Sequence, residues 1–216
     1  MNDRCPQTAL WPSLDAASSG RPDDDYYPTP RWLVEAILAE TQAHVCARSV
    51  LDLGAGTGGL ANAVCRAAVG HWKDAEMRVT AVEQDPVRCA VMRTEHPEWT
   101  VCEGDVWGWA AANRTRWDLV ISNPPFSNFD RWIELAQCLR SPGGRTLVLG
   151  HAGHLGGQKR APVWREHPPA LVAVSTRRAA YRNGETDHRD PVWFVWAGRG
   201  ESAQGTRLVW LRTERG

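Results

Sequence analysis

Apolar and polar positions follow a different period in successive segments of the chain. After Pro30, the apolar residues Trp32, Leu33, Ala36 and Ile37 recur at helical spacing. Further along, short apolar runs that are typical of buried strands alternate with segments in which apolar residues recur at helical spacing. These runs predict strands over 49–53, 78–83, 99–103, 117–122 and 144–149, and helices over 60–69, 86–96 and 129–139.

Strands that alternate with helices indicate a parallel sheet covered on both faces. The last three apolar runs, at 170–175, 192–196 and 208–211, have no long helical segment between them. We expect them to complete the sheet, with an antiparallel strand at its edge. The sequence therefore predicts an α/β fold with a doubly wound, mostly parallel sheet.

The first 25 residues differ from the rest of the chain in composition. Residues 1–25 mix Pro, Ser and Gly with three consecutive aspartates, without an apolar period, and predict a flexible tail. Residues 26–216 are expected to form a single domain. Within it, 26–150 would form the core and 151–216 the substrate-side loops and final strands.

A glycine-rich turn joins the first predicted strand to the helix that follows it. Glycines at 54 and 56 allow the backbone to turn tightly and to approach a ligand closely. Glu83 ends the next predicted strand, where a carboxylate can accept both ribose hydroxyls of an adenosine. A solvated strand-end residue is the structural alternative for Glu83. The pattern indicates a site for an adenosine-containing cofactor.

Asp52 determines which adenosine cofactor is expected. A carboxylate two residues before Gly54 would repel the pyrophosphate of a dinucleotide but attract the ammonium and sulfonium of S-adenosylmethionine. Asp105 follows the third strand, where its carboxylate can accept the adenine amino group while Val106 contacts the ring. Helix capping for Asp52 and a turn role for Asp105 are the alternatives. S-adenosylmethionine is the predicted cofactor.

The tetrapeptide Asn123-Pro124-Pro125-Phe126 directly follows the fourth predicted strand. Two prolines fix a rigid turn at the carboxyl edge of the sheet, where open α/β folds bind ligands. The Asn123 side-chain carbonyl and the Pro124 backbone carbonyl can accept both hydrogens of a planar amine. The ring of Phe126 can stack on a heterocycle. These four residues are the predicted catalytic residues, acting by positioning and electrostatic stabilisation.

With these motifs in order, residues 26–150 resemble the class I S-adenosylmethionine-dependent methyltransferases, which have a Rossmann-like fold. The match is with the amino-methyltransferases that carry Asn-Pro-Pro-Tyr or Asn-Pro-Pro-Phe. The segment from Tyr26 resembles the Thr-Pro segment of adenine-specific DNA methyltransferases, which implies that Thr29 and Pro30 lie near the methionine end of the cofactor. Residues 184–187 and 192–196 resemble small phage-type enzymes of this group.

Basic residues gather late in the chain. Residues 157–216 carry 11 basic and six acidic side chains, a net of +5, although the whole chain is formally neutral. The loop after the strand at 170–175 should open on the catalytic edge. It holds Arg177, Arg178 and Arg182, which are the predicted substrate contacts. A solvated charged surface is the alternative.

The sequence therefore predicts a methyltransferase that acts on the exocyclic amine of a nucleobase, with the 6-amino group of adenine in DNA preferred. RNA adenine or guanine methylation, protein glutamine methylation and a non-catalytic cofactor-binding subunit are the alternatives. Long-site specificity would need a dimer or a specificity partner. No metal is expected from the histidine and cysteine spacing, and the chain is expected to be cytoplasmic without a membrane span.

Overall fold

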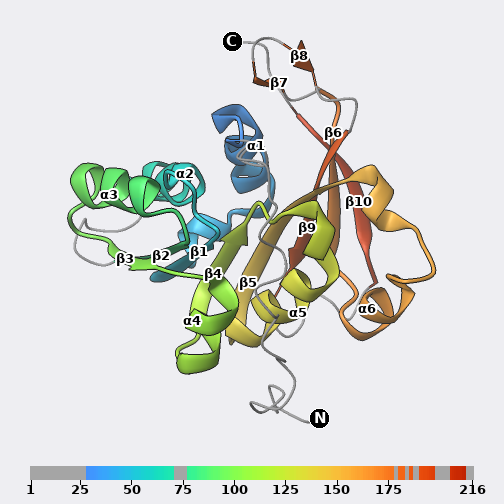
Figure 1. The fold of residues 1–216 in the computed structure, drawn as a ribbon. Helices are drawn as coiled ribbons and strands as arrows, with labels where there is room; N and C mark the ends of the chain where they lie inside the picture. Colours follow the sequence, from blue (N-terminus) through green and yellow to red (C-terminus); the bar gives the residue numbers. More distant parts are fainter. Residues whose placement is uncertain are drawn as a thin grey trace.

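An eight-stranded sheet runs through the centre of the molecule, with helices on both of its faces (Figure 1). The computed structural model describes residues 28–70, 77–177, 180–182, 185–186, 190–197 and 205–212, with 180–182 and 185–186 described by their backbone alone. The strand order is β10-β6-β9-β5-β4-β1-β2-β3. The strands are β1 (Ser49–Leu53), β2 (Arg78–Glu83), β3 (Thr100–Glu103), β4 (Trp117–Ser122), β5 (Arg140–His151), β6 (Leu171–Ser175), β9 (Pro191–Trp196) and β10 (Arg207–Leu211), beside a two-stranded sheet of β7 (Ala180–Arg182) and β8 (Glu185–Thr186).

All strands of the large sheet except β9 run in the same direction. This confirms the predicted α/β fold with a mostly parallel sheet. The antiparallel strand, however, lies inside the sheet between β5 and β6, and not at the predicted edge. All six residues of β9 are buried, because helices cover this part of the sheet on both faces. A strand that is apolar on both faces belongs to the interior of a sheet.

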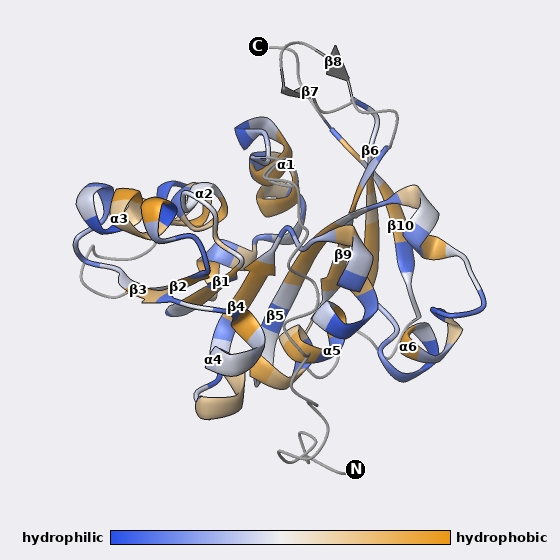
Figure 2. Cartoon of the chain, viewed as in Figure 1, coloured by the Kyte–Doolittle hydropathy of each residue, from blue (hydrophilic) through white to orange (hydrophobic). Residues whose placement is uncertain are grey.

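The helices divide between the two faces of the sheet. Apolar side chains of α1, α2 and α3 pack in one core cluster, and those of α4, α5 and α6 pack in another. Figure 2 shows apolar residues concentrated on the central strands and on the helix faces turned toward them. The helices are α1 (Arg31–Thr41), α2 (Gly59–Ala68), α3 (Pro86–Glu95), α4 (Val106–Ala112), α5 (Phe129–Leu139) and α6 (Ala161–Glu166), with short 3-10 helices η2 (Ala43–Val45), η3 (Phe126–Asn128) and η4 (Ala152–Leu155).

Aspartates begin two of these helices. The Asp85 carboxylate accepts hydrogen bonds from the backbone N–H groups of Val87 and Arg88, and Pro86 occupies the first helical position of α3. Asp105 caps α4 in the same way. Neither α4 nor α6 was predicted from the sequence, since both are short and lack a sustained apolar period.

Parallel strands place their carboxyl ends at one edge of the sheet. The segments that follow β1, β2, β4, β5 and β6 therefore leave from the same edge. Figure 1 shows that α1 and the β7–β8 pair, which follows β6, lie on the side of the sheet where these segments leave it. Open α/β sheets bind their ligands at such an edge.

Candidate active site

The glycine-rich turn after β1 has a backbone that requires glycine. Gly54, Gly56 and Gly58 have φ angles of 68°, 59° and 81°, in the left-handed region. The N–H groups of Gly54 and Ala55 donate to the carbonyl of Val82, at 2.9 and 3.0 Å, which joins the turn to the end of β2. The sequence prediction of a tight turn between strand and helix at Gly54 and Gly56 is confirmed.

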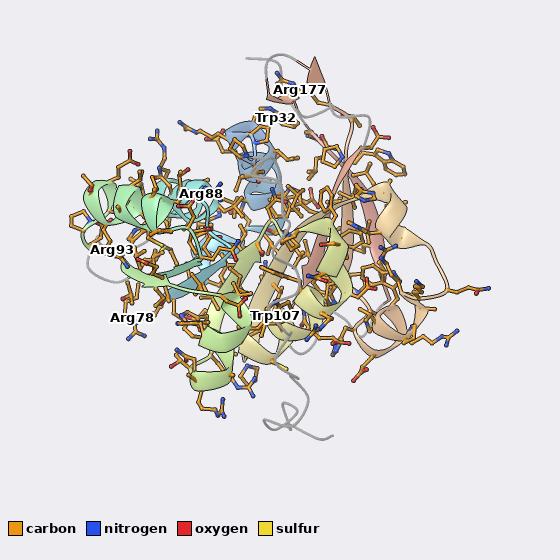
Figure 3. The ribbon with its side chains drawn as sticks, viewed as in Figure 1. Trp32, Arg78, Arg88, Arg93, Trp107 and Arg177 are labelled. Carbon is orange, nitrogen blue, oxygen red and sulfur yellow. The ribbon has the colours of Figure 1, made fainter. Side chains whose placement is uncertain are left out.

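Glu83 holds this turn from the neighbouring strand. Its Oε2 accepts a hydrogen bond from the backbone N–H of Gly56 at 2.8 Å, and its Oε1 accepts from Asp85 N–H at 2.9 Å. The Arg88 guanidinium lies 3.7 Å from Oε1 (the position of Arg88 is labelled in Figure 3). Each carboxylate oxygen has two acceptor positions, so these bonds leave capacity for ligand hydroxyls. Glu83 is therefore a fixed, 4% exposed carboxylate beside the turn, not a solvated strand end.

Asp52 is fully buried in the strand that leads into the turn. Its Oδ2 accepts from the Ala61 backbone N–H at 3.1 Å, while Oδ1 has no hydrogen-bond partner within the described part of the chain. Burial, with a further contribution from the negative charge of Glu83, raises the pKa of Asp52 from 3.8 to about 7. A buried carboxylate with an unsatisfied oxygen is suited to a cationic ligand, which would return the pKa toward its ordinary value.

Asp105 and Val106 lie after β3, at the start of α4. Oδ2 of Asp105 accepts from the N–H groups of Trp107 and Gly108, at 3.1 and 2.9 Å. Asp105 is exposed and Val106 is buried. Asp105 thus caps α4 through Oδ2, whereas the alternative raised from the sequence was a role in a turn. A contact with an adenine amino group stays a prediction.

The Asn123-Pro124-Pro125-Phe126 turn stands directly beside the glycine turn. Leu53 and Ser122 are register partners of the paired strands β1 and β4, so Gly54 and Asn123 leave neighbouring strands at the same level. Ser122 Oγ donates to the Leu53 carbonyl at 2.6 Å and accepts from Trp132 Nε1 at 2.7 Å. These bonds fix the end of β4 against β1 and against α5.

Asn123 is also held from the N-terminal side of the described residues. Its Nδ2 donates to Thr29 Oγ1 at 3.1 Å, which links residues 94 positions apart. Since the amide nitrogen faces Thr29, the carbonyl oxygen is the amide atom on the opposite side. Thr29 and Pro30, predicted from the sequence resemblance, are therefore next to the predicted catalytic turn. Their contact with a cofactor stays a prediction.

Two histidines surround Phe126, and sequence reasoning gave them no role. The centroid of the Phe126 ring lies 5.0 Å from that of His151 and 5.3 Å from that of His154, with edge-to-face geometry. His154 is 1% exposed and stacks on Phe129 at 3.8 Å. His151 ends β5, and its backbone N–H donates to His154 Nδ1 at 3.2 Å. Their position directly after the fifth predicted strand was the available sequence signal.

Of the three predicted substrate arginines, the structure describes the side chain of Arg177. It lies just after β6 with its guanidinium over the Trp32 ring, 4.8 Å from the ring centroid. Arg178 lies outside the described residues, and Arg182 is described by its backbone alone. Within the described ranges, no group of three or more His, Cys, Asp or Glu side chains is arranged to hold a metal ion. No helix in these ranges is long and apolar enough to cross a membrane.

Comparison with known proteins gives a family match over slightly more than half of the chain. The model of the methyltransferase small domain matches residues 31–148. The tRNA1(Val) (adenine(37)-N6)-methyltransferase of Klebsiella pneumoniae (strain 342) is 33% identical over 114 residues, which cover 50% of this chain and 44% of the relative. The protein of the same name from Salmonella arizonae is 32% identical over 111 residues, 48% of this chain and 42% of the relative. The matches span less than half the length of these relatives.

Solved structures share the fold. A Listeria monocytogenes protein assigned to the class I S-adenosylmethionine-dependent methyltransferases has a TM-score of 0.69 and 16% identity, covering 92% of this chain and 69% of that one. The methyltransferase subunit of a type I restriction-modification system from Streptococcus thermophilus has a TM-score of 0.62 and 12% identity, covering 80% and 45%. At these identities the likeness is evidence for the fold alone.

Proposed function

The chain belongs to the methyltransferase small domain family, and we propose that it methylates the 6-amino group of adenine in nucleic acid. The observation that carries the proposal is the side-by-side position of two turns. The glycine turn at Gly54 and the amine-accepting turn at Asn123 leave register-paired strands, β1 and β4, at one edge of the sheet. This arrangement would place a methyl donor and an amine acceptor next to each other.

The family and the fold imply S-adenosylmethionine as the cofactor, and the residues present fit it. Asp52 offers a buried, unsatisfied carboxylate oxygen for the positive charge at the methionine end. Glu83 would bind the ribose hydroxyls, and Asp105 with Val106 would contact the adenine. When bound, the cofactor supplies a methyl group on a positively charged sulfur.

The chain's own contribution to the reaction is to hold a planar amine. Asn123 Oδ1 and the Pro124 carbonyl would accept its two hydrogens, which draws the nitrogen lone pair out of conjugation and toward the methyl group. The rigidity of Pro124 and Pro125 and the Thr29 hydrogen bond fix these acceptors before the substrate arrives. Phe126 would stack on the base. A base within a duplex would first have to flip out of its stack.

DNA is the substrate that we propose first, on the sequence resemblance of residues 184–187 and 192–196 to phage-type DNA enzymes. The second candidate is structured RNA. It is favoured by the 33% identity with a relative that is named for tRNA adenine methylation. The cofactor and catalytic residues argued above serve either substrate.

The test uses the whole protein with methyl-labelled S-adenosylmethionine and, separately, duplex DNA, single-stranded DNA, RNA and a protein extract. Nuclease digestion and mass spectrometry would then identify the modified base. We expect 6-methyladenine from a nucleic acid arm. Label in the protein arm alone would overturn the proposal in favour of glutamine methylation.

Asn123→Ala provides the test of mechanism. We expect it to bind the cofactor normally and to lose methyl transfer. Asn113→Ala is the matched control, because Asn113 directly follows α4 and leads into the start of β4, at the opposite edge of the sheet. Transfer at the wild-type rate by Asn123→Ala would refute the assigned role.

A further inference from the structure

A cation–π pair of side chains, Trp32 and Arg177, joins two segments at the catalytic edge. Trp32 lies in the first turn of α1, and Arg177 follows β6 by two residues (Figure 3). The guanidinium carbon of Arg177 is 4.8 Å from the centroid of the Trp32 ring. We propose that this pair binds a backbone phosphate of the nucleic acid substrate next to the adenine that is methylated. The proposal rests on the proposed function.

Arg177 is held in place at both its backbone and its side chain. Ser175 Oγ donates to the Arg177 carbonyl at 2.7 Å and accepts from the Arg177 N–H at 3.2 Å. Ser175 itself is 5% exposed, so the anchor is part of the packed end of β6. The guanidinium lies over the indole ring of Trp32, which holds it by a cation–π contact. Because a guanidinium has five N–H donors, such a contact leaves N–H groups available to a phosphate.

The pair lies near the reacting groups because α1 is tied to the same turn. Thr29, three residues before Trp32, accepts the hydrogen bond from Asn123. Trp193 Nε1 donates to the Leu33 carbonyl at 3.2 Å, which fixes the start of α1 against β9. Since β6 and β4 point the same way in the sheet, Arg177 leaves at the edge where Asn123 lies. A nucleotide chain whose base enters beside Asn123 would pass this rim.

The surroundings of Arg177 favour an anionic ligand. Some exposed arginines of the described ranges pair with carboxylates, as Arg93 does with Glu103 at 3.2 Å and Arg207 with Glu40 at 3.2 Å, whereas exposed Arg114 donates to the Ala111 carbonyl. No carboxylate of the described residues lies within ion-pair distance of Arg177, which is exposed. A planar cation that is held by its backbone and by an aromatic ring, with no ion pair to a described carboxylate, matches the fork geometry with which arginine contacts phosphates.

The test measures methylation kinetics at several salt concentrations, with the nucleic acid that the wild type methylates. Arg177→Ala should raise KM by about 10- to 100-fold, the range that one charge-assisted hydrogen bond supports, while kcat changes little. The slope of log KM against log salt should fall by about one. Arg177→Lys should retain the slope but recover only part of the KM, since a lysine cannot present the fork.

Trp32 should act through Arg177 and not independently. Trp32→Ala should raise KM in the wild-type background but add little in the Arg177→Ala background, which a double-mutant cycle reports as coupling. If Trp32→Ala does not fold, Trp32→Phe takes its place in the cycle, since it keeps an aromatic ring of smaller size beside Arg177. Thermal unfolding and calorimetric cofactor binding check that each variant is intact.

Arg114→Ala is the matched control, because Arg114 is an exposed arginine that lies between α4 and the start of β4, far from the catalytic edge. An Arg177→Ala variant with the KM and salt slope of Arg114→Ala would overturn the phosphate site. Additive effects of the two substitutions would overturn the role of Trp32. A wild-type protein that binds the cofactor but methylates no nucleic acid would instead refute the proposed function itself.

Discussion

The protonation of buried Asp52 provides a direct test of how the cofactor site works. Without a ligand, Asp52 has a pKa of about 7, because burial and the nearby charge of Glu83 disfavour the carboxylate. At pH 6.5 the carboxyl would therefore be about three-quarters protonated. A cation about 4 Å away, at an effective dielectric near 20, would favour the ionised form by about 4 kcal/mol. That is sufficient to return the pKa to near 4, so S-adenosylmethionine binding at pH 6.5 should release about three-quarters of a proton.

Isothermal titration calorimetry measures this proton release, because the observed binding enthalpy changes with the ionisation enthalpy of the buffer that takes up the proton. The α-amino group of the cofactor is almost fully charged at pH 6.5 and contributes little. Asp52→Asn is the control, since it keeps the size of the side chain but cannot ionise. It should release no proton and bind the cofactor more weakly. The affinity of the wild type should rise with pH up to about 7 and then level off. Equal proton release by the two proteins would refute the reasoning.

The same carboxyl makes the stability of the ligand-free protein depend on pH. Because its folded-state pKa lies above the ordinary value of 3.8, Asp52 favours folding most below about pH 4, and this contribution is lost as the pH rises to about 7. The full difference is about 4 kcal/mol. Denaturant unfolding of wild type and Asp52→Asn at pH 5 and pH 8 should show the variant to be relatively more stable at pH 8. A constant difference between the two proteins would contradict the assignment.

Substitutions at three further positions test the packing and the base contact of the site. Gly58→Ala should lower the free energy of unfolding by about 2–4 kcal/mol, measured by denaturant titration, because φ is 81° and the new Cβ would lie 2.7 Å from Trp99. Gly150→Ala would place a Cβ 2.6 Å from His154 Nδ1 and should lower the free energy of unfolding by about 1–3 kcal/mol. Because the clash would shift the imidazole that contacts Phe126, the substitution should also lower kcat/KM. Phe126→Ala should raise the KM for nucleic acid about tenfold or more, because base stacking is lost, whereas Phe126→Tyr should retain activity. Equal KM values for wild type and Phe126→Ala would show that Phe126 does not stack on the base.

The first half of the fold could be predicted closely because local signals agree there. The strands predicted over 49–53, 78–83 and 117–122 have the same bounds as β1, β2 and β4. Each is a short apolar run that ends at glycine, at a polar residue or at a proline turn. The predicted helix at 60–69 is shifted by one residue from α2, and the predicted helix at 86–96 is one residue longer than α3 at its C-terminal end. Segments of this kind need no tertiary information.

The order of strands in the second half could not be obtained from local pattern. β9 follows β6 by some 15 residues, yet it is inserted between β5 and β6. The composition of residues 191–196 was the missed signal, since a run that is apolar at successive positions is covered on both faces and does not suit an edge. Similarly, α4 packs through Val106 and Ala110, too few positions to establish a period.

For the site, the sequence predicted which side chains lie near the glycine turn but not the hydrogen bonds that they form. The position of Asp52 and Glu83 near the glycine turn followed from strand ends. The use of the Glu83 carboxylate to hold Gly56 N–H, by contrast, depends on a turn geometry that only the structure gives. The contacts of His151 and His154 with Phe126 arise because β5 extends to residue 151 and η4 folds back over the turn. No spacing rule connects residues that meet in this way.

The two turns of the site are held by segments that are remote in sequence, and this has a consequence for the proposed reaction. Asn123 is fixed by Thr29 before α1, the preceding Ser122 by Leu53 and Trp132, and the glycine turn by Glu83. Positioning contributes to a reaction only if the groups are ordered before the substrate binds, since ordering them afterwards costs the free energy that positioning would supply. The amine acceptors and the cofactor turn are therefore fixed by the sheet and its helices. Under the proposed function, selection among nucleic acids would fall to His151 at the end of β5 and to the segments after β5 and β6, where His154 and Arg177 lie.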